Sequence, residues 1–117
     1  MTVVGIGVDV VDLARFAKTL ERTPGVRERL FTAAEAQLPV ESMAARFAAK
    51  EALMKALKVP SALPWHDIEV VSDEVGAPSF VVHGTAAERI EELNVRAHLS
   101  LSHDTTVATA FVVVEAC

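Results

Sequence analysis

The sequence has little of what several classes of protein depend on. Its 117 residues contain one cysteine, Cys117, so an intrachain disulfide and a cysteine-based zinc site are both excluded. No apolar run approaches the roughly 20 residues that a membrane-spanning helix requires, and the N-terminal residues lack the basic flank of a signal peptide. We therefore expect a cytoplasmic protein in a reducing compartment, with no membrane partner.

Aromatic residues and glycine-rich loops are also scarce. Five phenylalanines and one tryptophan form no stacking platform, and the net charge is −5, so binding to a nucleic acid is disfavoured. The GIG at 5–7 is followed by Val8 and Asp9, which matches neither a dinucleotide-binding GxGxxG nor a phosphate-binding GxxxxGK[ST] loop. No GxSxG elbow occurs and Ser102 directly precedes His103, which argues against a serine hydrolase.

The charge is unevenly distributed along the chain. Residues 1–60 contain nine Lys and Arg against seven Asp and Glu (+2), whereas residues 61–117 contain two against nine (−7). This asymmetry indicates that an anionic ligand or partner meets the first half, although scattered solvated charge is the alternative. With 51% hydrophobic and 23% charged residues, the composition is typical of one globular domain over residues 1–117.

The hydrophobic pattern predicts an α+β domain with an antiparallel sheet. Residues 3–11 alternate as a strand in which Gly5, Gly7 and Asp9 share the face opposite to the valines, so that another backbone can approach that face closely. Three helices are expected next: one from Asp12 to about Leu20, a short one opened by a Thr32–Glu35 capping box, and a long one over 42–57 closed by Pro60 and Pro64. A hairpin over 67–71 and 79–83 should follow. The last expected elements are a helix opened by a Thr85–Glu88 capping box and ended at Asn94, and a second hairpin around 103–106.

The long helix carries Glu51 and Lys55 one turn apart, with Phe47 a turn earlier on the same side. Taken alone, such a pair is usually a solvated ion pair. The glycines beside Asp9 and the many alanines of the helix allow close packing, however, which would bring Asp9 to Glu51. Two neighbouring carboxylates suit Mg²⁺, which takes further ligands from substrate phosphates. The cations that could neutralise those phosphates are Arg46, Lys50, Lys55 and Lys58.

Three segments resemble the holo-acyl-carrier-protein synthase family of phosphopantetheinyl transferases. They are GIGVDVVDLARF at 5–16, RFAAKEALMKAL at 46–57 and LSLSHD at 99–104, and LFTAAE at 30–35 resembles the family's linking motif. The resemblance implies a small single domain with an antiparallel sheet packed on a long helix, and a homotrimer with active sites between subunits. KVPSAL at 58–63 departs from the glycine-led turn of many members, so the family's contacts in this loop are not carried over.

Carried over by position, the resemblance implies that Asp9 and Glu51 bind Mg²⁺ and that Lys55 contacts the pyrophosphate of coenzyme A. It also implies that Arg46 and His103 contact coenzyme A phosphates. The residues that it assigns to contact with an acidic carrier protein are Arg15, Lys18 and Arg22.

The activity implied by the resemblance is transfer of 4'-phosphopantetheine from coenzyme A to a serine of apo acyl carrier protein. The products would be holo-acyl carrier protein and adenosine 3',5'-bisphosphate, in support of fatty acid biosynthesis. Glu51 and Lys55 would be the catalytic residues, and the base that takes the serine proton is left open between Glu51, a metal-bound water and Glu35. The alternative is a non-catalytic trimeric module that binds a carrier protein or a nucleotide.

Overall fold

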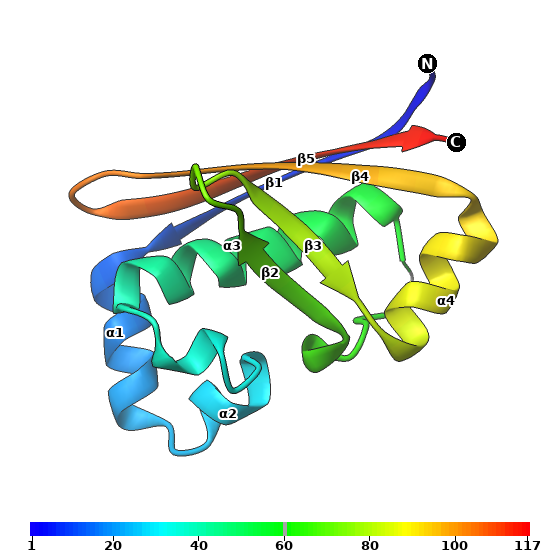
Figure 1. Cartoon of the computed structure of the whole chain (residues 1–117). Coiled ribbons are helices and arrows are strands. Elements are labelled where there is room, and N and C mark those ends of the chain that lie inside the picture. The colour runs from blue at the N-terminus through cyan, green and yellow to red at the C-terminus, as the bar shows by residue number, and fades with distance from the viewer. Residues whose placement is uncertain (60) are drawn as a thin grey trace.

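The molecule is built around one long helix that lies against a three-stranded sheet. A computed structural model describes residues 1–59 and 61–117, so Pro60, predicted as a helix-ending residue, lies outside the described residues. Helix α3 (Val40–Leu57) packs along one face of the sheet, and the hairpin of β2 (Ile68–Ser72) and β3 (Pro78–Val82) crosses in front of α3 in the view of Figure 1, where β2 contacts α3 and β3 contacts strand β4 (Val95–His103) of the sheet. The predicted α+β class with an antiparallel sheet on a long helix is confirmed.

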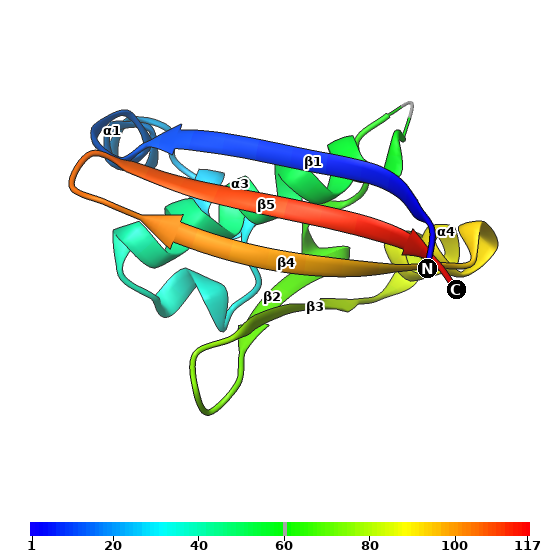
Figure 2. The ribbon, with the colours of Figure 1, turned by 90° about the horizontal axis from the view of Figure 1, so that it is seen from above.

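The larger sheet has the order β1-β5-β4, with antiparallel pairing throughout. Its strands are β1 (Val3–Asp12), β5 (Val107–Ala116) and β4 (Val95–His103). Figure 2 shows the three strands side by side above α3, with both termini at the same end of the sheet. The tight turn between β4 and β5 confirms the second predicted hairpin.

The remaining helices lie at the two ends of α3. Helix α1 (Leu13–Arg22) follows β1 directly, and its N-cap Asp12 accepts a hydrogen bond of 2.8 Å from the backbone N–H of Arg15, as predicted. Figure 1 shows α1 and α2 at one end of α3 and α4 at the other. The bounds of the other helices are α2 (Val26–Leu30), α4 (Gly84–Leu93) and the 3₁₀ turns η1 (Glu35–Gln37) and η2 (Trp65–Asp67).

The contact between β1 and α3 depends on two glycines of the strand. A Cβ on Gly5 would lie 1.9 Å from the carbonyl oxygen of Ala56, and a Cβ on Gly7 would lie 1.9 Å from that of Ala52. The strand therefore lies directly on the helix backbone, and the alanines of α3 at this contact are fully or nearly fully buried. This confirms the predicted close approach and brings Asp9, the next residue on the same strand face, to α3.

The opposite face of the sheet is apolar and exposed. It carries Val4, Ile6, Val8 and Val10 of β1 and Phe111 of β5, with exposed fractions from 40% to 60%. Along β1 these apolar residues alternate with Gly5, Gly7 and Asp9. Because the two glycines are buried against α3, the larger apolar side chains point away from the core.

Three details differ from the sequence prediction. The strands form two sheets rather than one, and α2 was not predicted, because its five residues carry too little periodicity to stand out. The Thr85–Glu88 capping box is wrong, since the N–H of Thr85 donates to Asp67 Oδ2 (2.9 Å) in a neighbouring segment. Asn94 does end α4 in the left-handed region, at φ 53°. Among the described residues no helix is both long and apolar enough to span a membrane.

Candidate functional site

A cleft of about 390 Å³ opens between β1, α1 and α3. Phe16 and Phe47 form part of its apolar wall, and its polar lining residues are Asp9, Asp12, Arg15, Thr19 and Glu51. Phe47 lies one helical turn before Glu51, as the spacing predicted. The cleft thus combines Asp9 and Glu51, which come from segments far apart in the sequence, with an apolar surface, and its third acid, Asp12, is engaged as the N-cap of α1.

Asp9 is held at the cleft by strand β1 and is paired with a cation from α3. The ammonium of Lys55 donates to Asp9 Oδ1 (3.1 Å) and to the carbonyl oxygen of Val8 (3.0 Å). The side chain of Lys55 is 54% exposed and that of Asp9 is 19% exposed. The ion pair is therefore at the edge of the protein, where Lys55 can turn toward a bound ligand.

The carboxyl group of Glu51 has a pKa above its ordinary value. Partial burial raises the pKa of Glu51, the charge of Asp9 raises it further, and the charge of Lys55 opposes both effects. An additional cation between Asp9 and Glu51 would remove the repulsion between them. The chemistry of the two acids thus fits a divalent metal ion.

Two carboxylates are a small ligand set, and that also suits magnesium. Among the described residues, no three acids, histidines or cysteines gather as a metal-binding group. Mg²⁺ is commonly held by one or two carboxylates, with water and substrate phosphates as the other ligands. Asp9 and Glu51 therefore fit a site that becomes complete only with a phosphate-bearing ligand.

Arg46 and His103 lie elsewhere on the chain. Arg46 Nε donates to the carbonyl oxygen of Val70 (3.3 Å) and its Nη2 to Ser72 Oγ (3.4 Å), so the side chain is directed toward β2. Arg46 and Glu51 are five residues apart, about 140° around a helix. His103 is the exposed last residue of β4. In the described part of the chain, the residues that line the Asp9–Glu51 cleft include neither of them.

The three basic residues assigned to carrier contact lie on α1. Arg15, Lys18 and Arg22 are all exposed, and their spacing of three and four residues places them along one side of the helix. Arg15 also lines the cleft. A partner bound to this side of α1 would therefore lie beside Asp9 and Glu51.

The predicted role of Lys50 is wrong. Its side chain is fully buried, and Nζ lies 2.7 Å from Glu35 Oε1, so it is not available to a phosphate. Burial lowers the pKa of Lys50, and the hydrogen bond that Lys50 donates to Glu35 opposes that shift. Lys50 lies seven residues from both Met43 and Leu57, and this apolar spacing is the signal that could have revealed its burial. Lys58 is exposed and ends α3 in the left-handed region.

Glu35 was one of the open choices for the base, and its position argues against that role. Only 1% of the residue is exposed. Its oxygens accept from Lys50, from the N–H of Thr32 and from the N–H of Val70. The carboxylate is thus fully occupied inside the protein and away from the cleft. Glu51 is the side-chain candidate that remains at the cleft.

Comparison with known proteins gives consistent results. Residues 5–111 match the family model of the 4'-phosphopantetheinyl transferase superfamily. The holo-[acyl-carrier-protein] synthase of Clavibacter michiganensis subsp. michiganensis is 61% identical over 112 residues, which are 95% of this chain and 94% of that protein. That of Leifsonia xyli subsp. xyli is 56% identical over 114 residues, 97% of each chain.

Solved structures show the same similarity. The holo-[acyl-carrier-protein] synthase of Neisseria meningitidis superposes with a TM-score of 0.87 at 32% identity, over 97% of this chain and 99% of that one. The ACPS-CoA complex of Chronobacterium ammoniagenes superposes with a TM-score of 0.85 at 30% identity, over 97% of each chain. With a family match over most of its length and close relatives over nearly all of it, this chain belongs to the 4'-phosphopantetheinyl transferase superfamily.

Proposed function

We propose that this chain is a holo-acyl-carrier-protein synthase, with all 117 residues acting as one catalytic domain. It transfers 4'-phosphopantetheine from coenzyme A to a serine of apo acyl carrier protein, and releases adenosine 3',5'-bisphosphate. The observation that carries the proposal is the meeting of Asp9 and Glu51 at one cleft, from segments more than 40 residues apart, with Lys55 paired to Asp9. The full-length similarity to holo-acyl-carrier-protein synthases supports it, and the non-catalytic alternative is not favoured.

Asp9 and Glu51 are the residues that would hold a magnesium ion. When bound, the ion would supply positive charge to the diphosphate oxygens of coenzyme A and offset the charge of the two acids. The fit rests on the raised pKa of Glu51 and on the Lys55 ammonium that already pairs with Asp9. The flexible stem of Lys55 allows the ammonium to leave Asp9 and pair with a phosphate of the substrate.

The transfer forms a bond between the serine oxygen and the phosphorus of the phosphopantetheine. The bond that breaks joins that phosphorus to the bridging oxygen of the diphosphate, and adenosine 3',5'-bisphosphate leaves with the electron pair. Glu51 takes the serine proton in this proposal, because it is the half-buried carboxylate beside the cleft and its pKa is raised. Lys55 offsets the charge that develops on the leaving bisphosphate.

The carrier protein would bind along α1. Arg15, Lys18 and Arg22 present three positive charges on the side of α1 that borders the cleft. An acidic carrier would be oriented by these charges so that its serine enters next to Glu51. Rim charges of this kind mainly affect the rate of association and its dependence on salt.

A homotrimer would complete the site. The exposed apolar face of the sheet supports assembly, since a surface with five large apolar side chains is typical of an interface. Arg46 and His103 lie outside the cleft of their own chain, and we propose that they contact coenzyme A phosphates in the site of a neighbouring subunit. A cytoplasmic location stays a prediction.

The direct test is a transfer assay. The protein is incubated with coenzyme A, Mg²⁺ and an apo acyl carrier protein, and the carrier is weighed by mass spectrometry. We expect the mass of one phosphopantetheine to be added. Glu51→Gln should abolish the addition, and Glu41→Gln, which changes an exposed acid in the first turn of the same helix, should leave it intact. Absence of transfer by the parent protein would refute the proposed function.

A further inference from the structure

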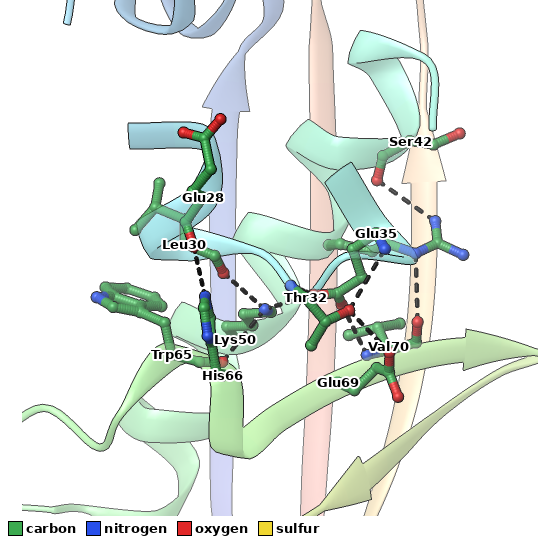
Figure 3. Close-up of polar contacts among 11 residues, drawn as sticks. Glu28, Leu30, Thr32, Glu35, Ser42, Lys50, Trp65, His66, Glu69 and Val70 are labelled. Atoms are coloured by element: carbon green, nitrogen blue, oxygen red, sulfur yellow. Dashed lines mark hydrogen bonds and ion pairs between the residues drawn. The ribbon is translucent and has the colours of Figure 1, made fainter. Parts of the chain in front are cut away.

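The buried ion pair of Lys50 and Glu35 lies behind the cleft and has no part in the reaction as proposed so far. The side chains are 0% and 2% exposed and their charged atoms are 2.7 Å apart. Figure 3 shows Lys50 reaching from α3 to Glu35 and to backbone oxygens of two other segments. Nζ donates to the carbonyl oxygens of Leu30 (2.7 Å) and Trp65 (3.3 Å) as well as to Glu35. All three donors of the ammonium are therefore used.

Glu35 extends these contacts to β2. Its Oε1 accepts from the N–H of Thr32 (3.0 Å), and its Oε2 accepts from the N–H of Val70 (2.9 Å) (Figure 3). Thr32 in turn donates through its hydroxyl to Glu69 (2.7 Å). The Lys50–Glu35 pair thus joins helix α3 and η1 to the end of α2, the loop before η1, the turn η2 and strand β2.

Four aromatic rings connect the same ion pair to the cleft. The ammonium of Lys50 lies 5.2 Å from the ring centroid of Phe31, a cation–π distance. Successive centroids then lie 6.1 Å apart from Phe31 to Phe16, 5.8 Å from Phe16 to Phe47 and 5.6 Å from Phe47 to Trp65. Trp65 returns to Lys50 through its carbonyl oxygen. The result is a closed ring of contacts that begins and ends at one ammonium group.

Three members of this arrangement form the wall of the cleft. Phe16, Phe47 and Leu30 all line it together with Asp9 and Glu51. Leu30 is held by its carbonyl oxygen, and the two phenylalanines are held through their ring neighbours. A displaced Lys50 would therefore shift the apolar wall that lies beside the two acids, although Lys50 itself is not among the residues that line the cleft.

Stability alone does not account for a buried pair of this kind. Taking two charges out of water costs several kcal/mol each, and well-packed apolar residues of similar volume are often as stabilising or more so. Hydrogen bonds to fixed backbone oxygens instead hold the segments in one geometry. Because α3 also carries Glu51, which follows Lys50 directly, the same contacts fix the turn of the helix that presents this acid to the cleft.

We propose that Lys50 and Glu35 are positioning residues, which hold the apolar wall of the cleft and the Glu51 turn of α3 in the geometry needed for transfer. The proposal rests on the proposed function, since it concerns the rate of that reaction. It predicts a loss in kcat with little change in the KM for coenzyme A, because Lys55, which pairs with the phosphates, is outside the ring of contacts.

The test replaces both members of the pair. A single change would leave a buried unpaired charge at a cost of about 3–5 kcal/mol, so the variant is Glu35→Gln combined with Lys50→Met. We expect this double variant to fold. Its kcat should be lowered by about ten- to a hundredfold, because small displacements of reacting groups have effects of that size. Its KM for coenzyme A should stay within about threefold of the parent value, which is no more than the loss of one exposed ion pair would cause. Trp65, the only tryptophan in the sequence, should become more accessible to acrylamide quenching.

Two further variants make the result decisive. Ile68→Ala opens a cavity at a fully buried position on β2 and controls for loss of stability, so it should lower the melting temperature and leave kcat unchanged. Phe31→Leu retains the ion pair and breaks the aromatic ring, and it should lower kcat about threefold, the effect of losing roughly 0.5–1 kcal/mol of aromatic contact. If the double variant does not fold, the kcat of Phe31→Leu tests the positioning role in its place.

The outcomes are distinct. A folded double variant, or Phe31→Leu, with the kcat of the parent would overturn the positioning role and leave the proposed function standing. A parent protein that transfers nothing would refute the proposed function, and the positioning role with it. A fall in kcat that Ile68→Ala reproduces at equal folded fraction would show a general effect of stability and would also overturn the inference.

Discussion

Lys55 and Asp9 form an ion pair of 3.1 Å between α3 and β1, beside a second acid, Glu51. Lys55 thereby offsets the charge of Asp9 that would attract a metal ion, and it is the residue that we assign to the substrate diphosphate. One cation thus has two anionic partners available to it. The occupancy of the site by metal and by coenzyme A should therefore be linked through Lys55.

This linkage predicts opposite effects of one substitution. Lys55→Met removes a competing cation, so the affinity for Mn²⁺ without coenzyme A should rise by up to about fivefold, the worth of an exposed ion pair. The KM for coenzyme A should rise, because a phosphate contact is lost. Isothermal titration calorimetry and initial rates measure the two effects. Arg29→Met, at an exposed cation of α2, serves as the control, and weaker Mn²⁺ binding by Lys55→Met would contradict the linkage.

The raised pKa of Glu51 has a consequence for stability. An acid whose pKa is higher in the folded than in the unfolded protein stabilises the fold below its unfolded pKa of about 4.3, and this contribution is lost as the pH rises through the folded pKa. In metal-free protein, Glu51→Gln should therefore raise the melting temperature at pH 7 relative to the parent.

The gain from Glu51→Gln should disappear at acidic pH, where Glu51 of the parent is itself protonated. Thermal unfolding followed by circular dichroism in a chelating buffer measures the two melting temperatures at pH 7 and at acidic pH. Glu41→Gln controls for the loss of one negative charge on α3. Equal melting temperatures of Glu51→Gln and the parent at pH 7 would contradict a pKa of Glu51 raised by burial and by the charge of Asp9.

The close contact of β1 with α3 makes Gly7 sensitive to substitution. In Gly7→Ala the new Cβ would lie 1.9 Å from the carbonyl oxygen of Ala52, so the strand has to move away from the helix. We expect a loss of about 1–3 kcal/mol in the free energy of unfolding, as for an overpacked core, measured by urea denaturation. Ser79→Ala on the exposed side of β3 should change it by less than about 0.5 kcal/mol, and an equally small effect at Gly7 would contradict the packing.

A site shared between subunits can be tested by complementation. Asp9→Asn and Arg46→Ala should each be inactive, since they remove groups from opposite sides of one composite site. When the two variants are coexpressed, about a quarter of the sites should contain an intact Asp9 and an intact Arg46 by random pairing in a cyclic oligomer. Transfer activity of the purified mixture measures this, and a mixture as inactive as its components would argue that the site lies within one chain.

Much of this arrangement was predictable from the sequence because it depends on local patterns. The alternation around Gly5 and Gly7 indicated a strand face open to close approach, and the alanines of the long helix indicated the surface that packs on it. The Thr32–Glu35 capping box also occurs as predicted, with reciprocal hydrogen bonds of 3.0 and 3.3 Å.

What was missed depends on contacts between distant segments. Lys50 was assigned to phosphates because its charge is visible in the sequence, whereas its partner Glu35 is 15 residues away and meets it only in the fold. The cap of α4 was misassigned for the same reason, since Asp67 rather than Glu88 accepts from the start of the helix. Periodicity describes the face on which a residue lies, and it does not reveal which distant side chain meets that face.

In the proposed site, Asp9 and Glu51 together bind one divalent cation that takes part in coenzyme A binding. Titration of Mn²⁺ followed by electron paramagnetic resonance, with coenzyme A present, measures this in the parent, in Asp9→Asn and in Glu51→Gln. The account predicts one tightly bound Mn²⁺ per subunit in the parent and at least a tenfold weaker site in each variant, about the loss of one charged ligand. Parental Mn²⁺ affinity in both variants would contradict it.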